Sequence, residues 1–198
     1  MSKREKGFTL IELLIVVAII AILAAIAVPN FLEAQIRSKV SRAKSDMRSL
    51  KVALEAYRLD NQSYPRDILG VGTWTTWNQL TTPIAYLTSI PPSPFKYKEY
   101  VSAGYNDIGL PAYDYAQYDH VMTYRGETTM RPEAIRCQAL SIFYVVTCAG
   151  PDQDLDIVWS NIDGLGRQDA AARAMLYDPT NGTVSSGDII MTSKGFHS

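Results

Sequence analysis

The sequence predicts an α+β protein in which one long N-terminal helix carries a globular head. Two observations predict the helix: an apolar run from Leu13 to Val28 and an amphipathic stripe that follows it as far as Tyr57. A third observation predicts the β part, because residues 139–148 (ALSIFYVVTC) are apolar, aromatic and β-branched. The 198 residues suffice for one domain in addition to the helix.

The N-terminal segment is long and apolar enough to cross a membrane. Residues 8–28 provide roughly the 20 residues that a spanning helix needs, and Glu12 is their only charged side chain. Basic residues precede the segment, which predicts that this end stays in the cytoplasm and that the remainder is exported. A carboxylate in a spanning helix is costly and usually has a partner. A neighbouring copy would supply one if the chain were cut between Gly7 and Phe8, because the cut creates a free amine.

Residues 6–14 (KGFTLIELL) resemble the class III signal of type IV pilins and type II secretion pseudopilins. In that family a membrane-embedded prepilin peptidase cuts after the glycine and methylates the new N-terminal phenylalanine. The resemblance implies cleavage between Gly7 and Phe8, N-methylation of Phe8, assembly through Glu12 and a helix break at Pro29. It also implies a long helix packed on a small antiparallel β-sheet head, with the shape of a lollipop.

The resemblance divides the chain into four parts. These are a leader peptide at 1–7, a transmembrane and assembly helix at 8–29, an amphipathic stem helix at 30–61 and a periplasmic α+β head at 62–198. The subunit is expected to cross the inner membrane once and then to enter a periplasmic or surface filament. Two other interpretations remain, an uncleaved anchor and a secretory signal peptide cut after Ala25-Ile26-Ala27, which would release a soluble binding protein.

The stem shows apolar residues at alternating spacings of four and three, which is typical of an amphipathic helix. They are Ile36, Val40, Ala43, Met47, Leu50, Leu54 and Tyr57. We expect this stripe to cover a sheet and the helix to end near Asp60, because Pro65 disfavours the helical conformation just before it. The stem is basic, with seven basic and four acidic residues at 30–61, a net charge of +3. Residues 62–198 have nine basic and fourteen acidic residues, a net charge of −5.

The charge distribution argues against a nucleic-acid-binding protein, which would concentrate basic residues on one face. Opposite charges at different heights would instead suit subunits stacked at an offset.

Between stem and sheet, Thr82-Pro83 predicts the start of a short helix through Leu87. The segment from Tyr86 to Phe95 resembles the major (G-type) pseudopilins, which place a Tyr-Leu, a proline and a Pro-aromatic pair there. The matching residues are Tyr86, Leu87, Pro91, Pro94 and Phe95.

Several features of the head have two interpretations. The tyrosines at 105, 113, 115, 118 and 124 form either a binding surface or, as we prefer, a layer of rings packed over the sheet. Cys137 and Cys148 would need a turn at 138–140 to form a disulfide, so two thiols are favoured, with Cys148 buried. Asn181-Gly182 predicts a hairpin turn, residues 169–176 a short helix, and residues 157–159 and 188–192 strands.

The only candidate metal site is the triplet Asp152, Asp154 and Asp156, whose oxygens suit calcium. The Gly150-Pro151-Asp152 turn resembles the Gly-x-Asp of the calcium loop in the major pseudopilins, but their longer glycine-rich loop is absent. A solvated acidic turn is the alternative. No calcium site of the EF-hand type is present, because its glycine and distal glutamate are missing.

No pattern indicates catalysis, so we expect a protein that is not an enzyme. His120 and His197 lack a ligand spacing, and Gly70-Val71-Gly72 lacks the lysine and helix of a phosphate-binding loop. The expected function is that of a structural subunit of a type II secretion pseudopilus. Its expected partners are copies of itself in a helical filament, prepilin peptidase, the inner-membrane assembly platform and minor pseudopilins, with no nucleic acid. A subunit of a surface type IV pilus is the alternative.

Overall fold

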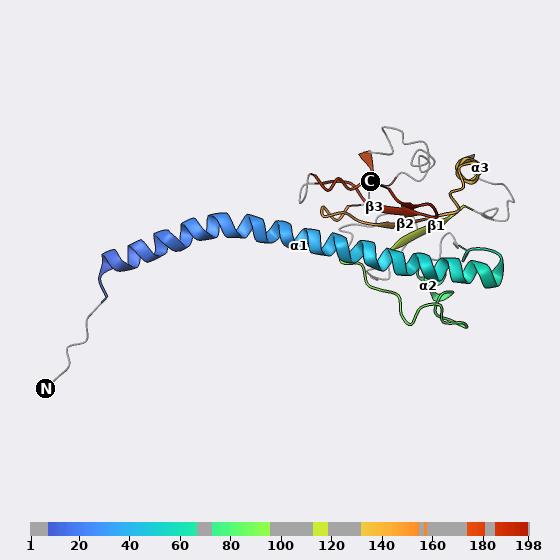
Figure 1. Cartoon of the computed structure of the whole chain (residues 1–198), viewed down its shortest axis with the longest axis horizontal. Coiled ribbons are helices and arrows are strands. Elements are labelled where there is room, and N and C mark those ends of the chain that lie inside the picture. The colour runs from blue at the N-terminus through green and yellow to red at the C-terminus, as the bar shows by residue number, and fades with distance from the viewer. Residues whose placement is uncertain are drawn as a thin grey trace.

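The structure is a computed structural model that describes residues 8–66, 73–95, 113–118, 132–154, 157, 174–180 and 185–197. One long helix, α1 (Leu10–Asn61), extends from a head whose other elements gather around its C-terminal half (Figure 1). The further elements are α2 (Thr73–Asn78), β1 (Asp114–Gln117), α3 (Pro132–Ala139), β2 (Tyr144–Cys148), β3 (Ile189–Thr192) and β4 (Gly195–Phe196). The predicted α+β class with a long N-terminal helix is confirmed.

Helix α1 is continuous from its first to its last residue. It ends at Asn61 and is capped by Gln62, whose positive φ of 56° turns the chain out of the helix. Arg58 lies in the last turn, where its positive charge interacts favourably with the negative end of the helix dipole. The break predicted at Pro29 is wrong, because the helix runs through this residue. A proline removes one backbone hydrogen bond, and here α1 only bows gently along its N-terminal half (Figure 1).

The C-terminal half of α1 packs on the sheet with the predicted stripe. Val40, Ala43, Met47, Leu50 and Leu54 are buried, and Ala53 joins them. Ile36 and Tyr57, at the two ends of the stripe, are partly buried against the same core. The prediction that this face covers a sheet is confirmed, since the core also contains Tyr144, Val146 and Met191 from β2 and β3.

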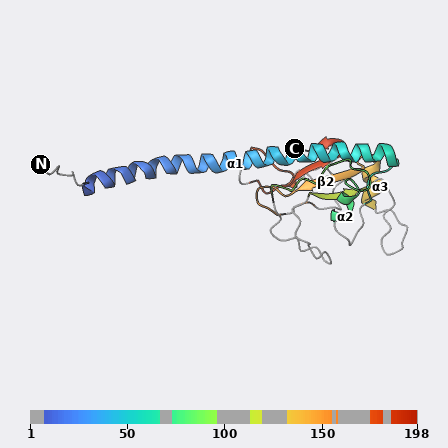
Figure 2. The same cartoon turned by 90° about the horizontal axis from the view of Figure 1, so that it is seen from below.

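The sheet is antiparallel with the strand order β1-β2-β3-β4. In its register Asp114 of β1 is paired with Thr147 of β2, Val146 of β2 with Met191 of β3, and Thr192 of β3 with Gly195 of β4. Alternate residues of β2 point to opposite faces, so Val145 belongs to a second core with Cys137, Ile142 and Ile190, while Val146 faces α1. One face of the sheet is therefore covered by α1 and the other lies on the side of α3 (Figures 1 and 2).

The strand predicted at residues 139–148 begins later than expected. Residues as far as Ala139 belong to α3, which starts at Pro132, a residue well suited to the first turn of a helix. The chain then turns at Ser141, which has a positive φ of 56°, before β2 begins at Tyr144. The strand predicted near residue 188 is confirmed as β3, and the short β4 that follows was not predicted.

The helix predicted from Thr82 to Leu87 is wrong. In this region the amides of Tyr86 and Leu87 both donate to the carbonyl oxygen of Leu80, which closes a wide turn in place of a helix. Tyr86 also donates to Asp60 Oδ2 (2.9 Å), so the loop is attached to the end of α1. The hairpin at Asn181-Gly182, nearly all of the helix at 169–176 and the strand at 157–159, apart from Ile157, lie outside the described residues.

The packed-ring interpretation of the tyrosine-rich region holds for the residues that the structure describes. Tyr113, Tyr115 and Tyr118 are buried. The centroid of the Tyr115 ring lies 5.3 Å from that of Trp77 and 6.2 Å from that of Tyr144. The indole of Trp77 donates to the Tyr113 carbonyl oxygen (2.8 Å). Tyr105 and Tyr124 lie outside the described residues.

Candidate assembly site

The N-terminal half of α1 presents an apolar surface that nothing in the described chain covers. Every residue from 8 to 32 is exposed, and the large aliphatic and aromatic side chains among them are half to three-quarters accessible. This helix is the one in the described residues that is long and apolar enough to cross a membrane. Such a surface is stable only in lipid or against other apolar helices.

Glu12 lies at the start of this surface, where it caps its own helix. Its carboxylate accepts hydrogen bonds from the backbone N–H (2.9 Å) and the hydroxyl (2.6 Å) of Thr9. In return the Glu12 amide donates to Thr9 Oγ1 (3.3 Å), which completes a capping box. The signal for this contact in the sequence is a threonine, Thr9, three residues before a glutamate, Glu12, which is the spacing of a capping box.

Phe8 precedes this cap and is 71% exposed. A cut before Phe8 would therefore place a free amine one residue before the capping box. Gly7 lies outside the described residues, so cleavage there and methylation of Phe8 stay predictions.

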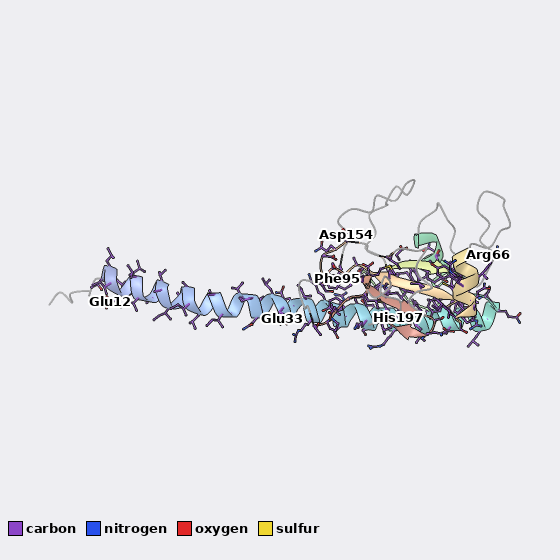
Figure 3. All side chains as sticks on the ribbon, turned by 90° about the horizontal axis from the view of Figure 1, so that it is seen from above. Glu12, Glu33, Arg66, Phe95, Asp154 and His197 are labelled. Atoms are coloured by element: carbon purple, nitrogen blue, oxygen red, sulfur yellow. The ribbon has the colours of Figure 1, made fainter. Side chains whose placement is uncertain are left out.

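The head approaches α1 closely just beyond Pro29. Glu33 and Arg37 form an ion pair on the helix (Figure 3 labels Glu33). Tyr177 of the head belongs to the core against which Ile36 of α1 packs. Burial raises the pKa of the Tyr177 hydroxyl, the Arg37 charge lowers it, and Asp178 and Glu33 raise it. The burial of Tyr177 in this core attaches that part of the head to the stem.

Polar side chains of α1 attach the sheet to the stem farther along. Glu55 accepts hydrogen bonds from the hydroxyls of Tyr64 (3.1 Å) and Tyr144 (3.3 Å). The Arg58 guanidinium lies over the rings of Tyr64 and Phe143, at 5.0 and 5.2 Å. Burial and, next, the Glu55 carboxylate raise the pKa of Tyr64 to about 12. These contacts attach the segment after α1 and strand β2 to the C-terminal part of the stem.

The two cysteines are buried thiols that are not joined in a disulfide, as predicted. Cys148 Sγ lies 3.1 Å from Ser93 Oγ, and burial raises the pKa of its thiol to about 12. A thiol with such a pKa is protonated at neutral pH and therefore unreactive.

The acidic triplet is only partly described. Asp152 Oδ1 accepts the backbone N–H of Asp154 (3.3 Å), which closes the turn, and Asp156 lies outside the described residues. No three His, Cys, Asp or Glu side chains of the described segments are arranged to hold a metal ion. Calcium binding by this triplet stays a prediction.

The histidines do not form a site in the part of the chain that the structure describes. His197 Nε2 lies 2.9 Å from Thr192 Oγ1, a contact within the β3–β4 hairpin. Burial and, next, Lys194 lower the pKa of His197, so its ring is neutral at pH 7. His120 lies outside the described residues.

Two family models match the chain in succession. The prokaryotic N-terminal methylation motif matches residues 2–28, which contain Gly7, Phe8 and Glu12. The model of type II secretion system (T2SS) protein G matches residues 30–111, which contain the stem and the loop that follows it. No solved structure matches the chain.

Curated relatives come from both secretion systems and pili. The type II secretion system core protein G of Escherichia coli is 32% identical over 130 residues, which are 64% of this chain and 77% of the relative. The same core protein of Pseudomonas aeruginosa is 44% identical over 63 residues, 32% of this chain and 44% of the relative. The type IV major pilin protein PilA of Myxococcus xanthus is 54% identical over 63 residues, 32% of this chain but only 29% of that pilin. The chain therefore spans less than half of the length of the Pseudomonas aeruginosa core protein and of the Myxococcus xanthus pilin.

Proposed function

The chain belongs to the protein G family of type II secretion systems, and on this basis we propose that it is the repeating structural subunit of a pseudopilus that drives protein export. The single observation that supports assembly most directly is the uncovered apolar surface of residues 8–32. In the membrane this surface lies in lipid. In a filament the same surface packs against equivalent helices of neighbouring subunits, so that one segment serves both states.

Processing precedes assembly in this proposal. Prepilin peptidase removes residues 1–7 between Gly7 and Phe8 and methylates the Phe8 amine. The mature subunit then crosses the inner membrane once, with its head in the periplasm, until the inner-membrane assembly platform and the minor pseudopilins admit it to the filament. The match of the N-terminal methylation motif to residues 2–28 supports this order of events.

Glu12 provides the register between subunits. In the separate subunit its carboxylate is held by Thr9 of the same chain, at 2.6 and 2.9 Å. In the filament we propose that the Phe8 amine of a neighbouring chain becomes its partner, since a charged donor makes a stronger hydrogen bond than a neutral one. An unpaired carboxylate in an apolar helix bundle is costly, so only registers that bring the amine to Glu12 are stable.

A surface type IV pilus is the second candidate, because the relative from Myxococcus xanthus is a major pilin. That likeness covers 32% of this chain, whereas the likeness to the core protein G of Escherichia coli covers 64%. The longer match reaches well past the helix into the head. We therefore prefer the secretion pseudopilus, and a role as a structural subunit over one as an enzyme.

The test compares Glu12→Ala with Glu33→Ala in cells that contain the other components of the secretion system. Both variants lose a glutamate from α1, but Glu33 lies beyond the apolar surface and is paired with Arg37. We expect both chains to insert in the membrane and to begin at a methylated Phe8 by intact mass. We expect the filament yield to fall sharply for Glu12→Ala alone. A wild-type yield with Glu12→Ala would refute the register mechanism, and an unprocessed N-terminus would refute the processing step.

A further inference from the structure

Basic side chains begin directly beyond the exposed apolar surface of α1. That surface ends at Phe31 and Leu32, which are 63% and 51% exposed. Arg37, Lys39 and Arg42 follow on the same helix, and all three are exposed. We call these three residues the juxtamembrane cations. Because they lie just beyond the segment that is long and apolar enough to cross a membrane, their nearest surroundings in a membrane-anchored subunit are lipid headgroups.

Carboxylates of the described residues compensate the juxtamembrane cations only in part. Arg37 is paired with Glu33 on the next turn of the helix. Arg42 Nε lies 3.8 Å from Asp46 Oδ2, and the arginine side chain is 62% exposed, so this contact is weak. Lys39 has no carboxylate within 4.0 Å in the described part of the chain. The stem, with its net charge of +3, therefore favours an anionic partner at this height.

The juxtamembrane cations lie on both sides of the stem and do not form one face. At 3.6 residues per turn, Lys39 and Arg42 are about 60° apart around α1 and about 140–160° from Arg37. The stripe of α1 that packs on the head lies between these two sides. A protein that docks from one direction would contact only one side. Lipid headgroups surround a membrane-spanning helix, so they contact both.

The juxtamembrane cations also lie at the height of the headgroups. Arg37, Lys39 and Arg42 are 5, 7 and 10 residues beyond Leu32, or about 8, 10 and 15 Å along α1. The headgroup layer extends about 5–8 Å beyond the hydrocarbon. Helical side chains lean toward the N-terminus, which is the membrane side here, and long basic side chains extend their charged ends toward headgroups. Arg42, the farthest of the three, is within about 8 Å of that layer, which is one Debye length at physiological salt.

We propose that the juxtamembrane cations bind the phosphates of anionic phospholipids in the leaflet that faces the head. This inference rests on the proposed function, in which residues 8–32 of the unassembled subunit lie in the membrane. The contacts hold the subunit at one depth, since a shift along the membrane normal moves Lys39 away from the phosphates. They are lost when the subunit leaves the bilayer for the filament. Anionic lipid therefore stabilises the unassembled subunit and competes with assembly.

The test identifies the lipid that surrounds the stem at Leu32. A tryptophan introduced as Leu32→Trp lies two turns before Lys39 on the same side of α1, and brominated acyl chains quench it on contact. The full chain is reconstituted in vesicles of phosphatidylcholine and phosphatidylglycerol in which one lipid or the other is brominated. The chain without Leu32→Trp gives the background of the native tryptophans. We expect phosphatidylglycerol to be enriched about fivefold at the introduced tryptophan.

Two charge variants of the Leu32→Trp chain test the residues. Lys39→Gln together with Arg42→Gln should reduce the enrichment from about fivefold to about one, which is no preference. The matched control, Arg48→Gln together with Lys194→Gln, removes the same charge from exposed positions farther from the membrane and should keep the enrichment.

The outcomes separate this inference from the proposed function. Equal quenching by the two lipids would overturn the inference and leave the proposed function intact. The same holds for an enrichment that Lys39→Gln with Arg42→Gln leaves unchanged, or that the control also removes. A tryptophan at position 32 that neither lipid quenches would overturn the membrane placement on which both rest.

Discussion

Leu54 and Leu59 provide a matched test of what attaches the head to the stem. Both are leucines on α1, but Leu54 is fully buried against the sheet and Leu59 is 82% exposed. Replacing a buried leucine by alanine typically costs about 2–5 kcal/mol, because the transfer energy is lost and a cavity remains. The same substitution at an exposed helical position changes stability by only about 0.5 kcal/mol. We therefore expect Leu54→Ala to destabilise the head by about 3 kcal/mol and Leu59→Ala to have little effect.

Thermal unfolding of the full chain in detergent micelles measures this difference. Near-ultraviolet circular dichroism is the suitable signal, since it reports the packed rings of Tyr64, Trp77 and Tyr144 and is insensitive to the part of α1 that stays helical in the micelle. For a chain of 198 residues, a loss of about 3 kcal/mol lowers the melting temperature by about 6–12 °C. Equal shifts for the two variants, or a shift below about 2 °C for Leu54→Ala, would refute the view that the buried stripe attaches the head.

Three further predictions concern the head. The folded state keeps the Tyr64 proton up to a pKa of about 12, whereas the unfolded chain loses it near 10.0, so stability falls as the pH rises between these values. Tyr64→Phe should flatten that decline in urea unfolding, and an unchanged slope would contradict it. The pKa of His197 is lowered from 6.5 in the folded state, so the unfolded chain binds this proton first and stability falls as the pH drops below about 6.5. His197→Asn should weaken this acid dependence, measured between about pH 7.5 and 5. Trp77→Phe removes the hydrogen bond to the buried Tyr113 carbonyl and should cost about 1–3 kcal/mol by urea unfolding, whereas a change below about 0.5 kcal/mol would contradict that role.

The stem could be predicted from the sequence because its signal extends over many turns. The stripe from Ile36 to Tyr57 repeats at helical spacing, and local periodicity of that length outweighs one unfavourable residue such as Pro29. The core of β2 was also predictable, since Tyr144 to Val146 are aromatic and β-branched. The start of the strand was not, because the preceding alanine and leucine fit a helix end as well as a strand.

The remainder of the head depends on contacts that no local pattern encodes. The turn at 80–87 is closed by the amides of Tyr86 and Leu87, which donate to the Leu80 carbonyl oxygen. The Tyr86 hydroxyl also donates to Asp60, and this bond requires the end of α1 to be present. The two-residue strand β4 is too short to produce an alternating pattern. At the assembly site the opposite applies: the capping box of Thr9 and Glu12 is purely local, and a search for Ser or Thr three residues before Glu would have predicted it.

The contact between Lys51 and Ser193 joins residues that are 142 positions apart in the chain. Contacts of this separation give the head a high contact order, and chains with a high contact order fold slowly because a long loop must close first. Helix α1 can form within microseconds, yet the side of its stripe that β3 covers stays open until residues 189–192 arrive. During that interval Met47 and Leu54 are available to the wrong partners. In the membrane-anchored subunit that we propose, lipid covers the apolar residues 8–32 during that interval, so the open stripe of the stem is the apolar surface of α1 that still needs a partner.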